Sequence, residues 1–137
     1  MPLFAGAASA QTDQAVTACE NWLALDAERN RLSRRWQKLE TQLAHEHNFL
    51  KLSRRQQRKL PQAQELYEID DRLEELWEQQ DALLKILPTL VATSALGLAG
   101  KLAVAATHVC KDENEEGHYL IVSILRDLKT MMPADVP

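Results

Sequence analysis

Apolar residues recur at helical spacing through the first half of the chain. Between residues 22 and 50 they follow two interleaved seven-residue series, in which seven of the nine positions are apolar. The series are Trp22, Arg29, Trp36, Leu43, Leu50 and Leu25, Leu32, Leu39, Glu46. Two such series are typical of a long helix that packs along a single seam, as in a coiled coil.

A second segment repeats the pattern with one polar interruption. Its series are Leu66, Leu73, Gln80, Leu87 and Ile69, Leu76, Leu83, Leu90. Pro61 suits a first helical position, Ser53 can cap a short turn before it, and Pro88 stops or kinks the helix. Because helices joined by a short connection are usually antiparallel neighbours, we predict a helical hairpin over residues 15–87.

Charge supports this pairing, since residues 28–59 carry a net charge of +7 and residues 60–87 carry −6. Folding about the connection predicts a register with these neighbours: Leu50 with Leu66, Leu43 with Leu73, Trp36 with Gln80, and Leu32 with Leu83. The same register sets Arg34, Arg35 and Lys38 against the acidic side chains of Glu74, Glu75, Glu78 and Asp81. Gln80 either accepts a hydrogen bond from the Trp36 indole or points outward.

The last third of the chain predicts two shorter helices, at about 94–110 and 113–132. Thr93 or Ser94 can cap the first helix, and Asp112 followed by Glu115 resembles a capping box for the second. We therefore expect an all-α domain over residues 15–132, with the two shorter helices on the open end of the hairpin, a flexible segment at 1–14 and a tail at 133–137. The predicted core residues are Trp22, Leu25, Leu32, Leu39, Leu43, Leu73, Leu76, Leu83, Leu98, Leu102, Leu125 and Leu128.

Composition narrows the class of protein. The chain has 137 residues and a net charge of −4, so it is not a polycation that binds nucleic acid or anionic lipid over its whole surface.

The sequence also bears on the compartment of the protein. Residues 8–10 resemble a signal-peptidase site, but no Lys or Arg precedes them. The apolar stretch 86–110 contains Pro88 and Lys101, which disfavour a membrane span. With only Cys19 and Cys110, we expect a cytoplasmic protein without disulfides.

Catalytic and cofactor motifs are scarce, and we expect neither an enzyme nor a cofactor. Gly100-Lys101 overlaps the phosphate-loop pattern, but the first glycine and the Ser/Thr are replaced. The best metal candidates are His108, Cys110 and His118, near a polar loop. The alternative interpretation is a helix end, where His108 meets the negative end of the helix dipole and acids cap the next helix.

The most distinctive feature is a basic cluster at the predicted tip of the hairpin. Its members are Lys51, Arg54, Arg55, Arg58 and Lys59. Such a cluster can contact phosphates. The alternative, which we favour because no stacking aromatic residue accompanies the cluster, is that it neutralises Glu65 and Glu68.

These observations predict a non-enzymatic helical adaptor or regulatory protein that acts through protein–protein interaction. A slim apolar helix leaves more apolar surface than one hairpin covers, so we also expect a homodimer. The predicted oligomer contact consists of Gly97, Gly100, Leu98 and Leu102. The alternative function is a nucleic-acid-binding accessory factor that uses residues 51–59.

Overall fold

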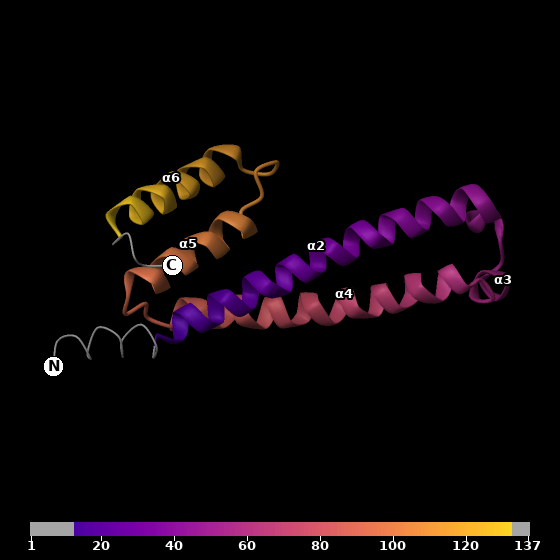
Figure 1. The fold of residues 1–137 in the computed structure, drawn as a ribbon, viewed down its shortest axis with the longest axis horizontal. Coiled ribbons are helices and arrows are strands. Elements are labelled where there is room, and N and C mark those ends of the chain that lie inside the picture. The colour runs from indigo at the N-terminus through magenta and orange to yellow at the C-terminus, as the bar shows by residue number, and fades with distance from the viewer. Residues whose placement is uncertain (1–12, 133–137) are drawn as a thin grey trace. The chain divides into compact units, whose positions relative to one another are not determined.

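The computed structural model describes residues 13–132, and within them every regular element is a helix (Figure 1). The elements are α2 (Gln14–His47), η1 (Phe49–Lys51), α3 (Arg54–Arg58), α4 (Pro61–Ile86), η2 (Leu87–Thr89), α5 (Ala95–His108) and α6 (Glu115–Met131). The described residues contain no strand, which confirms the all-α hairpin with two shorter helices. The predicted tail, residues 1–12 of the predicted flexible segment and the signal-peptidase resemblance lie outside the described residues.

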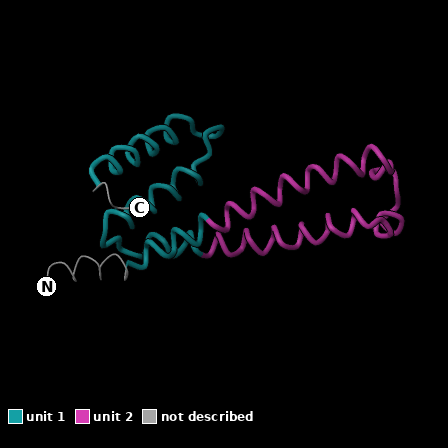
Figure 2. The backbone as a smooth tube through the Cα atoms, in the orientation of Figure 1, with its two compact units in different colours: residues 1–23, 83–137 teal, residues 24–82 magenta. Residues whose placement is uncertain are grey.

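The chain, which we expected to form one domain, divides into two compact units (Figure 2). One unit comprises residues 24–82, the middle of the hairpin and its tip. The other comprises residues 1–23 and 83–137, which include the first turns of α2, the last turn of α4, and helices α5 and α6. Helices α2 and α4 run through both units, so each unit contains part of the predicted seam.

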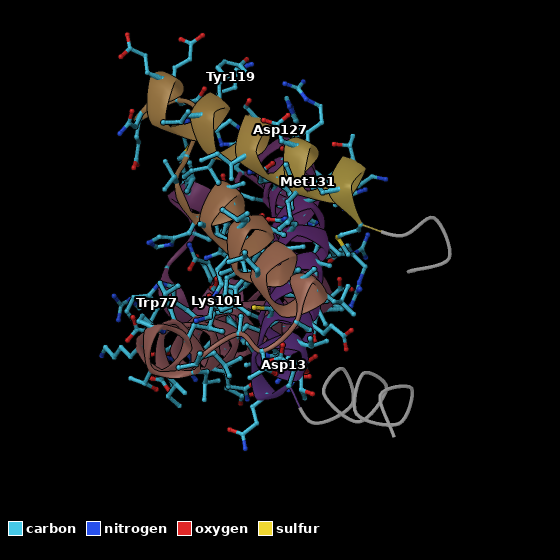
Figure 3. The ribbon with its side chains drawn as sticks, turned by 90° about the vertical axis from the view of Figure 1, so that its left-hand side faces the viewer. Asp13, Trp77, Lys101, Tyr119, Asp127 and Met131 are labelled. Carbon is cyan, nitrogen blue, oxygen red and sulfur yellow. The ribbon has the colours of Figure 1, made fainter. Side chains whose placement is uncertain are left out.

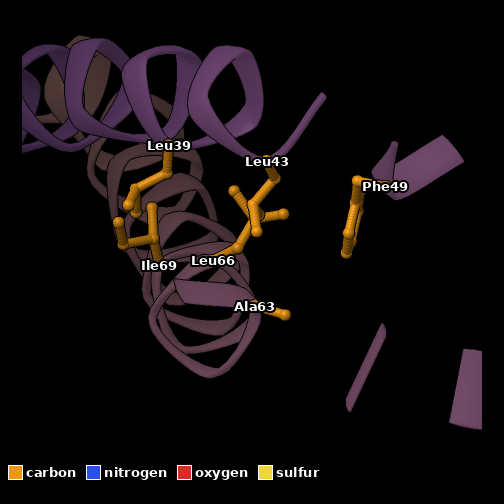
Figure 4. Close-up of a cluster of buried hydrophobic side chains, with 6 residues drawn as sticks. All are labelled: Leu39, Leu43, Phe49, Ala63, Leu66 and Ile69. Carbon is orange, nitrogen blue, oxygen red and sulfur yellow. The ribbon is translucent and has the colours of Figure 1, made fainter. Parts of the chain in front are cut away.

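A cluster of buried apolar side chains holds the unit of residues 24–82 together (Figure 4). It consists of Leu39, Leu43, Phe49, Ala63, Leu66 and Ile69. On α4 the buried residues Leu66, Ile69, Leu76 and Gln80 follow the two predicted series. The heptad pattern therefore identified the buried face of α4 correctly.

The predicted register of the hairpin is wrong. Gln80 is buried, but its Nε2 donates to Asp26 Oδ1 at 3.2 Å rather than meeting Trp36. The Trp36 indole nitrogen has no hydrogen-bond partner among the residues that the structure describes. The two helices are displaced because α2 ends before Leu50 and because Ala63, one turn before Leu66, already packs against the end of α2.

The new register also changes the ion pairs. Arg35 Nε lies 2.6 Å from Glu65 Oε2, and Arg72 Nε lies 2.7 Å from Glu28 Oε2. The predicted pairing of Arg35 with the acidic residues Glu74, Glu75, Glu78 and Asp81 is therefore wrong. Hydrogen bonds from these guanidinium groups lower the pKa of Glu65 and of Glu28. Opposite charges do bridge the helices, but Arg72 is a cation in the acidic half of the hairpin.

In the other unit, α5 packs closely against the start of α2. The buried side chains that join α2, η2 and α5 are Ala18, Cys19, Trp22, Leu87 and Val104. A Cβ atom at Gly97 would overlap the carboxylate of Asp13, and one at Gly100 would lie 2.9 Å from Cys19 Cβ. The two glycines therefore make an intrachain contact, in which the absence of a side chain lets the two helices approach each other.

Asp13, which we assigned to the flexible segment, is a buried anchor of this unit. Its carboxylate accepts hydrogen bonds from the Ala15 N–H at 3.0 Å, the Thr93 N–H at 3.1 Å and the Ser94 hydroxyl at 2.6 Å. Burial alone would raise the pKa of Asp13, but these hydrogen bonds outweigh it and hold the pKa below its usual value. Asp13 thus ties the first turn of α2 to the segment that enters α5.

Ser94 caps α5 as predicted, through a hydrogen bond from the Gly97 N–H. The cap of α6 is Asn114 rather than the predicted box of Asp112 and Glu115. Leu98 was predicted to be buried but is 47% exposed, because α5 turns small residues inward instead. Its buried residues are Gly97, Ala99, Val104 and Ala106.

Four of the twelve predicted core residues are fully buried: Trp22, Leu39, Leu43 and Leu76. Seven others are half-buried: Leu25, Leu32, Leu73, Leu83, Leu102, Leu125 and Leu128. Helix α6 packs on α5 but has no fully buried residue, and Tyr119 and Met131 are exposed on it (Figure 3).

We expect Asp13→Ala to lower the free energy of unfolding by about 1–3 kcal/mol at pH 7, because it leaves the buried Ala15 N–H and the part-buried Thr93 N–H without their acceptor. Because the pKa of Asp13 is depressed in the folded state, its stabilisation is present above the unfolded pKa of about 3.9 and is lost as the pH falls through the folded value. Urea unfolding at pH 7 and below pH 3 measures this, with the exposed Gln14→Ala as control. An equal difference in the free energy of unfolding between wild type and Asp13→Ala at both pH values would contradict this pH dependence.

We expect Gln80→Glu to destabilise the hairpin at pH 7 by about 1–3 kcal/mol, since it sets a second carboxylate against the buried Asp26. The matched control is Gln79→Glu, which adds the same charge at the exposed neighbouring position. Thermal unfolding followed by circular dichroism compares the two variants. Equal melting temperatures would show that the Asp26–Gln80 hydrogen bond does not fix the register.

Candidate functional site: a basic tip on the helical hairpin

The connection between α2 and α4 begins where Asn48 takes a left-handed conformation, with φ 49°. Asn tolerates this conformation better than most residues and commonly ends helices in this way. The turn directs Phe49 into the apolar cluster and leaves Leu50 81% exposed. Leu50, predicted as the last seam position, therefore lies on the surface of the tip.

The rest of the connection is a folded structure with its own hydrogen bonds. Ser53 caps α3 as predicted, and the side chain of Gln56 completes a capping box. The Gln57 side chain donates to the Phe49 carbonyl at 2.9 Å, and that of Gln64 donates to the Arg58 carbonyl at 2.8 Å. Helix α3 is thereby attached both to η1 before it and to α4 after it.

This framework carries the five predicted cations, which we call the basic tip: Lys51, Arg54, Arg55, Arg58 and Lys59. All five are exposed, and within residues 13–132 none forms an ion pair with a carboxylate. Glu65 pairs with Arg35 instead, and Glu68 forms no ion pair within residues 13–132, so our interpretation that the tip neutralises Glu65 and Glu68 through ion pairs is wrong. Because no acidic residue occurs between Glu46 and Glu65, the tip is a local concentration of positive charge.

The register leaves a second charged surface exposed on α4. We call it the acidic strip and define it as Asp70, Asp71, Glu74 and Glu78, all exposed. None of the four pairs with a cation in the described part of the chain. Trp77 is 57% exposed (Figure 3). It lies beside the strip, since Asp70, Glu74 and Trp77 follow one another at helical spacing on α4.

Two surface residues escaped prediction from the sequence. Leu50 continued the heptad series, and only Asn48 signals that the helix ends before it. Trp77 occupies no seam position. The periodicity therefore predicts that it is exposed but does not mark it as a candidate contact residue. Each is a large apolar side chain next to a group of like charges.

Of the predicted oligomer contact, the structure assigns Gly97 and Gly100 to the contact between α5 and α2. Leu98 remains largely exposed, and Leu102 is half-buried. Gly100 and Lys101 lie in the interior of α5 rather than at its N-terminus, so they do not form a phosphate-binding turn.

The predicted metal candidates do not converge. No group of three His, Cys, Asp or Glu side chains able to hold an ion occurs in residues 13–132. His108 and Cys110 are exposed, whereas His118 Nδ1 lies 2.9 Å from the Val109 carbonyl. Because a carbonyl only accepts, His118 carries its proton on Nδ1 and ties α6 to the end of α5.

The two cysteines differ in their exposure to solvent. Both are free. Cys19 is buried, and its burial raises the pKa of the thiol, whereas Cys110 is exposed.

A cavity of about 250 Å³ beside Asp13 is lined by Gln14, Thr89 and Leu90 among others. The Asp13 carboxylate there is already satisfied by its own chain.

Comparison with known proteins gives no further guide, because no family model, curated protein or solved structure matches the chain. Among the helices described, none has both the length and the apolar character needed to cross a bilayer.

We expect Gln57→Ala to loosen the tip without unfolding the hairpin, because it removes the hydrogen bonds to the carbonyls of Phe49 and Leu52. Amide hydrogen exchange should become faster in residues 52–60 and stay unchanged in the middle of α2 and α4. Gln79→Ala, an exposed change on α4, is the control. Unchanged exchange in the tip of Gln57→Ala would show that Gln57 does not hold it.

Proposed function

We propose that this chain is a non-enzymatic adaptor or regulatory protein that binds an acidic protein surface through the basic tip. The observation that carries the proposal is that five exposed cations, on the capped and internally bonded connection between α2 and α4, form no ion pair with an acidic residue among the described residues of their own chain. Arg35 and Arg72, by contrast, each pair with a carboxylate on the other helix of the hairpin. The tip differs from them in this respect.

The exposed Leu50 favours a protein partner. An apolar side chain amid cations matches a surface that offers carboxylates around an apolar contact, which is a common composition for a protein interface. It has no counterpart in a phosphate backbone. The net charge of −4 further weakens attraction to a polyanion at long range.

Binding of nucleic acid is the second candidate, and it rests on the same five unpaired cations. The dependence of binding on salt identifies the nucleic-acid candidate. Each phosphate contact with duplex DNA contributes a slope of about −0.9 to the plot of log affinity against log salt concentration.

The proposal includes self-association to a homodimer and a cytoplasmic location. Self-association is supported by large apolar side chains that stay exposed in the single chain, namely Leu50, Trp77, Leu98, Leu120 and Ile124.

We expect reversal of the tip charges to abolish partner binding while leaving the hairpin folded. The variant carries Arg54→Glu, Arg55→Glu, Arg58→Glu and Lys59→Glu, all at exposed positions without ion pairs in the described chain. Capture of proteins from the native cell with wild type and variant measures binding, and circular dichroism measures folding. A matched control carries Arg31→Glu, Arg34→Glu and Lys38→Glu, which reverse three exposed cations on α2.

Loss of a captured protein from the tip variant, but not from the control, supports the proposal. Retention of DNA or RNA at physiological salt, lost on tip reversal, would replace it with the nucleic-acid alternative. Equal capture by wild type and by both variants would overturn it.

A further inference from the structure

We infer that the acidic surface recognised by the basic tip is the acidic strip of a second copy of this chain, with the two hairpins antiparallel. The inference rests on the proposed function, since it names a partner for the same tip. Both surfaces lie in the unit of residues 24–82.

Charge complementarity is the first support. The tip offers five exposed cations and the strip offers four exposed carboxylates, and neither group forms an ion pair within the described chain. Opposite charges on two surfaces of one protein attract the two surfaces of different copies. Within residues 13–132 of one chain, no ion pair satisfies this attraction.

The tip cannot reach its own strip. Helix α4 begins at Pro61, and at about 1.5 Å per residue Asp70 lies about 14 Å and Glu78 about 26 Å along the helix from that point. The tip precedes Pro61 and is fastened there by the Gln64 side chain. Pairing of the two surfaces therefore requires another chain.

A two-fold axis satisfies both contacts at once. If two hairpins lie antiparallel and overlap by the distance from tip to strip, each tip lies beside the strip of the other copy. In such an isologous dimer the same two surfaces meet twice. The overlap required is about 14–26 Å of helix, which α4 supplies between Pro61 and Glu78.

The exposed apolar residues fit the same arrangement. Trp77 lies about 24 Å from the start of α4, within the strip, and Leu50 lies in the tip. The antiparallel overlap brings Leu50 of each copy near Trp77 of the other. A tryptophan beside complementary charges is a frequent energetic centre of an interface, with the charges selecting the partner.

Charge exchange between two variants tests the inference. The tip variant is the fourfold Glu substitution described above, and the strip variant carries Asp70→Lys, Asp71→Lys, Glu74→Lys and Glu78→Lys. Molecular mass is measured by light scattering at tens of micromolar protein and about 50 mM salt, where surface charges are weakly screened. Wild type and the Arg31, Arg34 and Lys38 control should be dimers, and each of the two variants alone should be a monomer.

An equimolar mixture of the tip and strip variants should restore the dimer, because each negative tip then meets a positive strip and each positive tip meets a negative strip. Circular dichroism verifies that every variant is folded, so restoration by mixing cannot be attributed to refolding. The wild-type dimer should dissociate as salt is raised.

Monomeric wild type, or a mixture that stays monomeric, overturns the inference. So does a dimer that survives both reversals but is lost on Leu98→Gln with Ile124→Gln, which places the contact on α5 and α6. If the tip variant stays dimeric but loses a protein captured from the cell, the inference fails and the proposed function stands. If it keeps both the dimer and the captured proteins, both fail.

Discussion

The end of helix α2 at His47 decides which charges of the hairpin find partners. Asn48 turns the chain in a left-handed conformation, so that Phe49 enters the apolar cluster and Leu50 faces outward. This fixes how far α2 and α4 overlap. Arg35 then reaches Glu65 and Arg72 reaches Glu28, while the tip and the strip keep their charges exposed.

The sequence predicts the helices better than their alignment. Caps at Ser53 and Ser94, the start at Pro61 and the buried face of α4 all follow from local rules that involve a few neighbouring residues. The register does not, because a heptad pattern keeps apolar residues in contact when one helix slides along the other. The hydrogen bond between Gln80 and Asp26 is specific to the observed register, and Asp26 lies outside both apolar series.

The cations of the candidate site could be identified from the sequence, but whether acidic residues of the same chain pair with them could not. The five cations of the tip stand out in the sequence, yet whether they neutralise Glu65 depends on Arg35, which lies thirty residues before Glu65. The two glycines of the predicted oligomer contact show the same limit of the sequence. Glycine at positions 97 and 100 signals a close contact, and only the fold shows that Asp13 and Cys19 make it.

The capping box and the Gln57 hydrogen bonds give the tip a backbone that is already ordered before any partner arrives. Ordering a residue costs about 1–2 kcal/mol, and here that cost belongs to folding rather than to association. A rigid cluster of like charges acts chiefly on the rate of encounter, which electrostatic steering accelerates, whereas the lifetime of a complex depends on what is buried after contact. In the complex that we propose, the arginines of the tip govern how quickly the partner is found, and the exposed Leu50 beside them contributes to how long it stays.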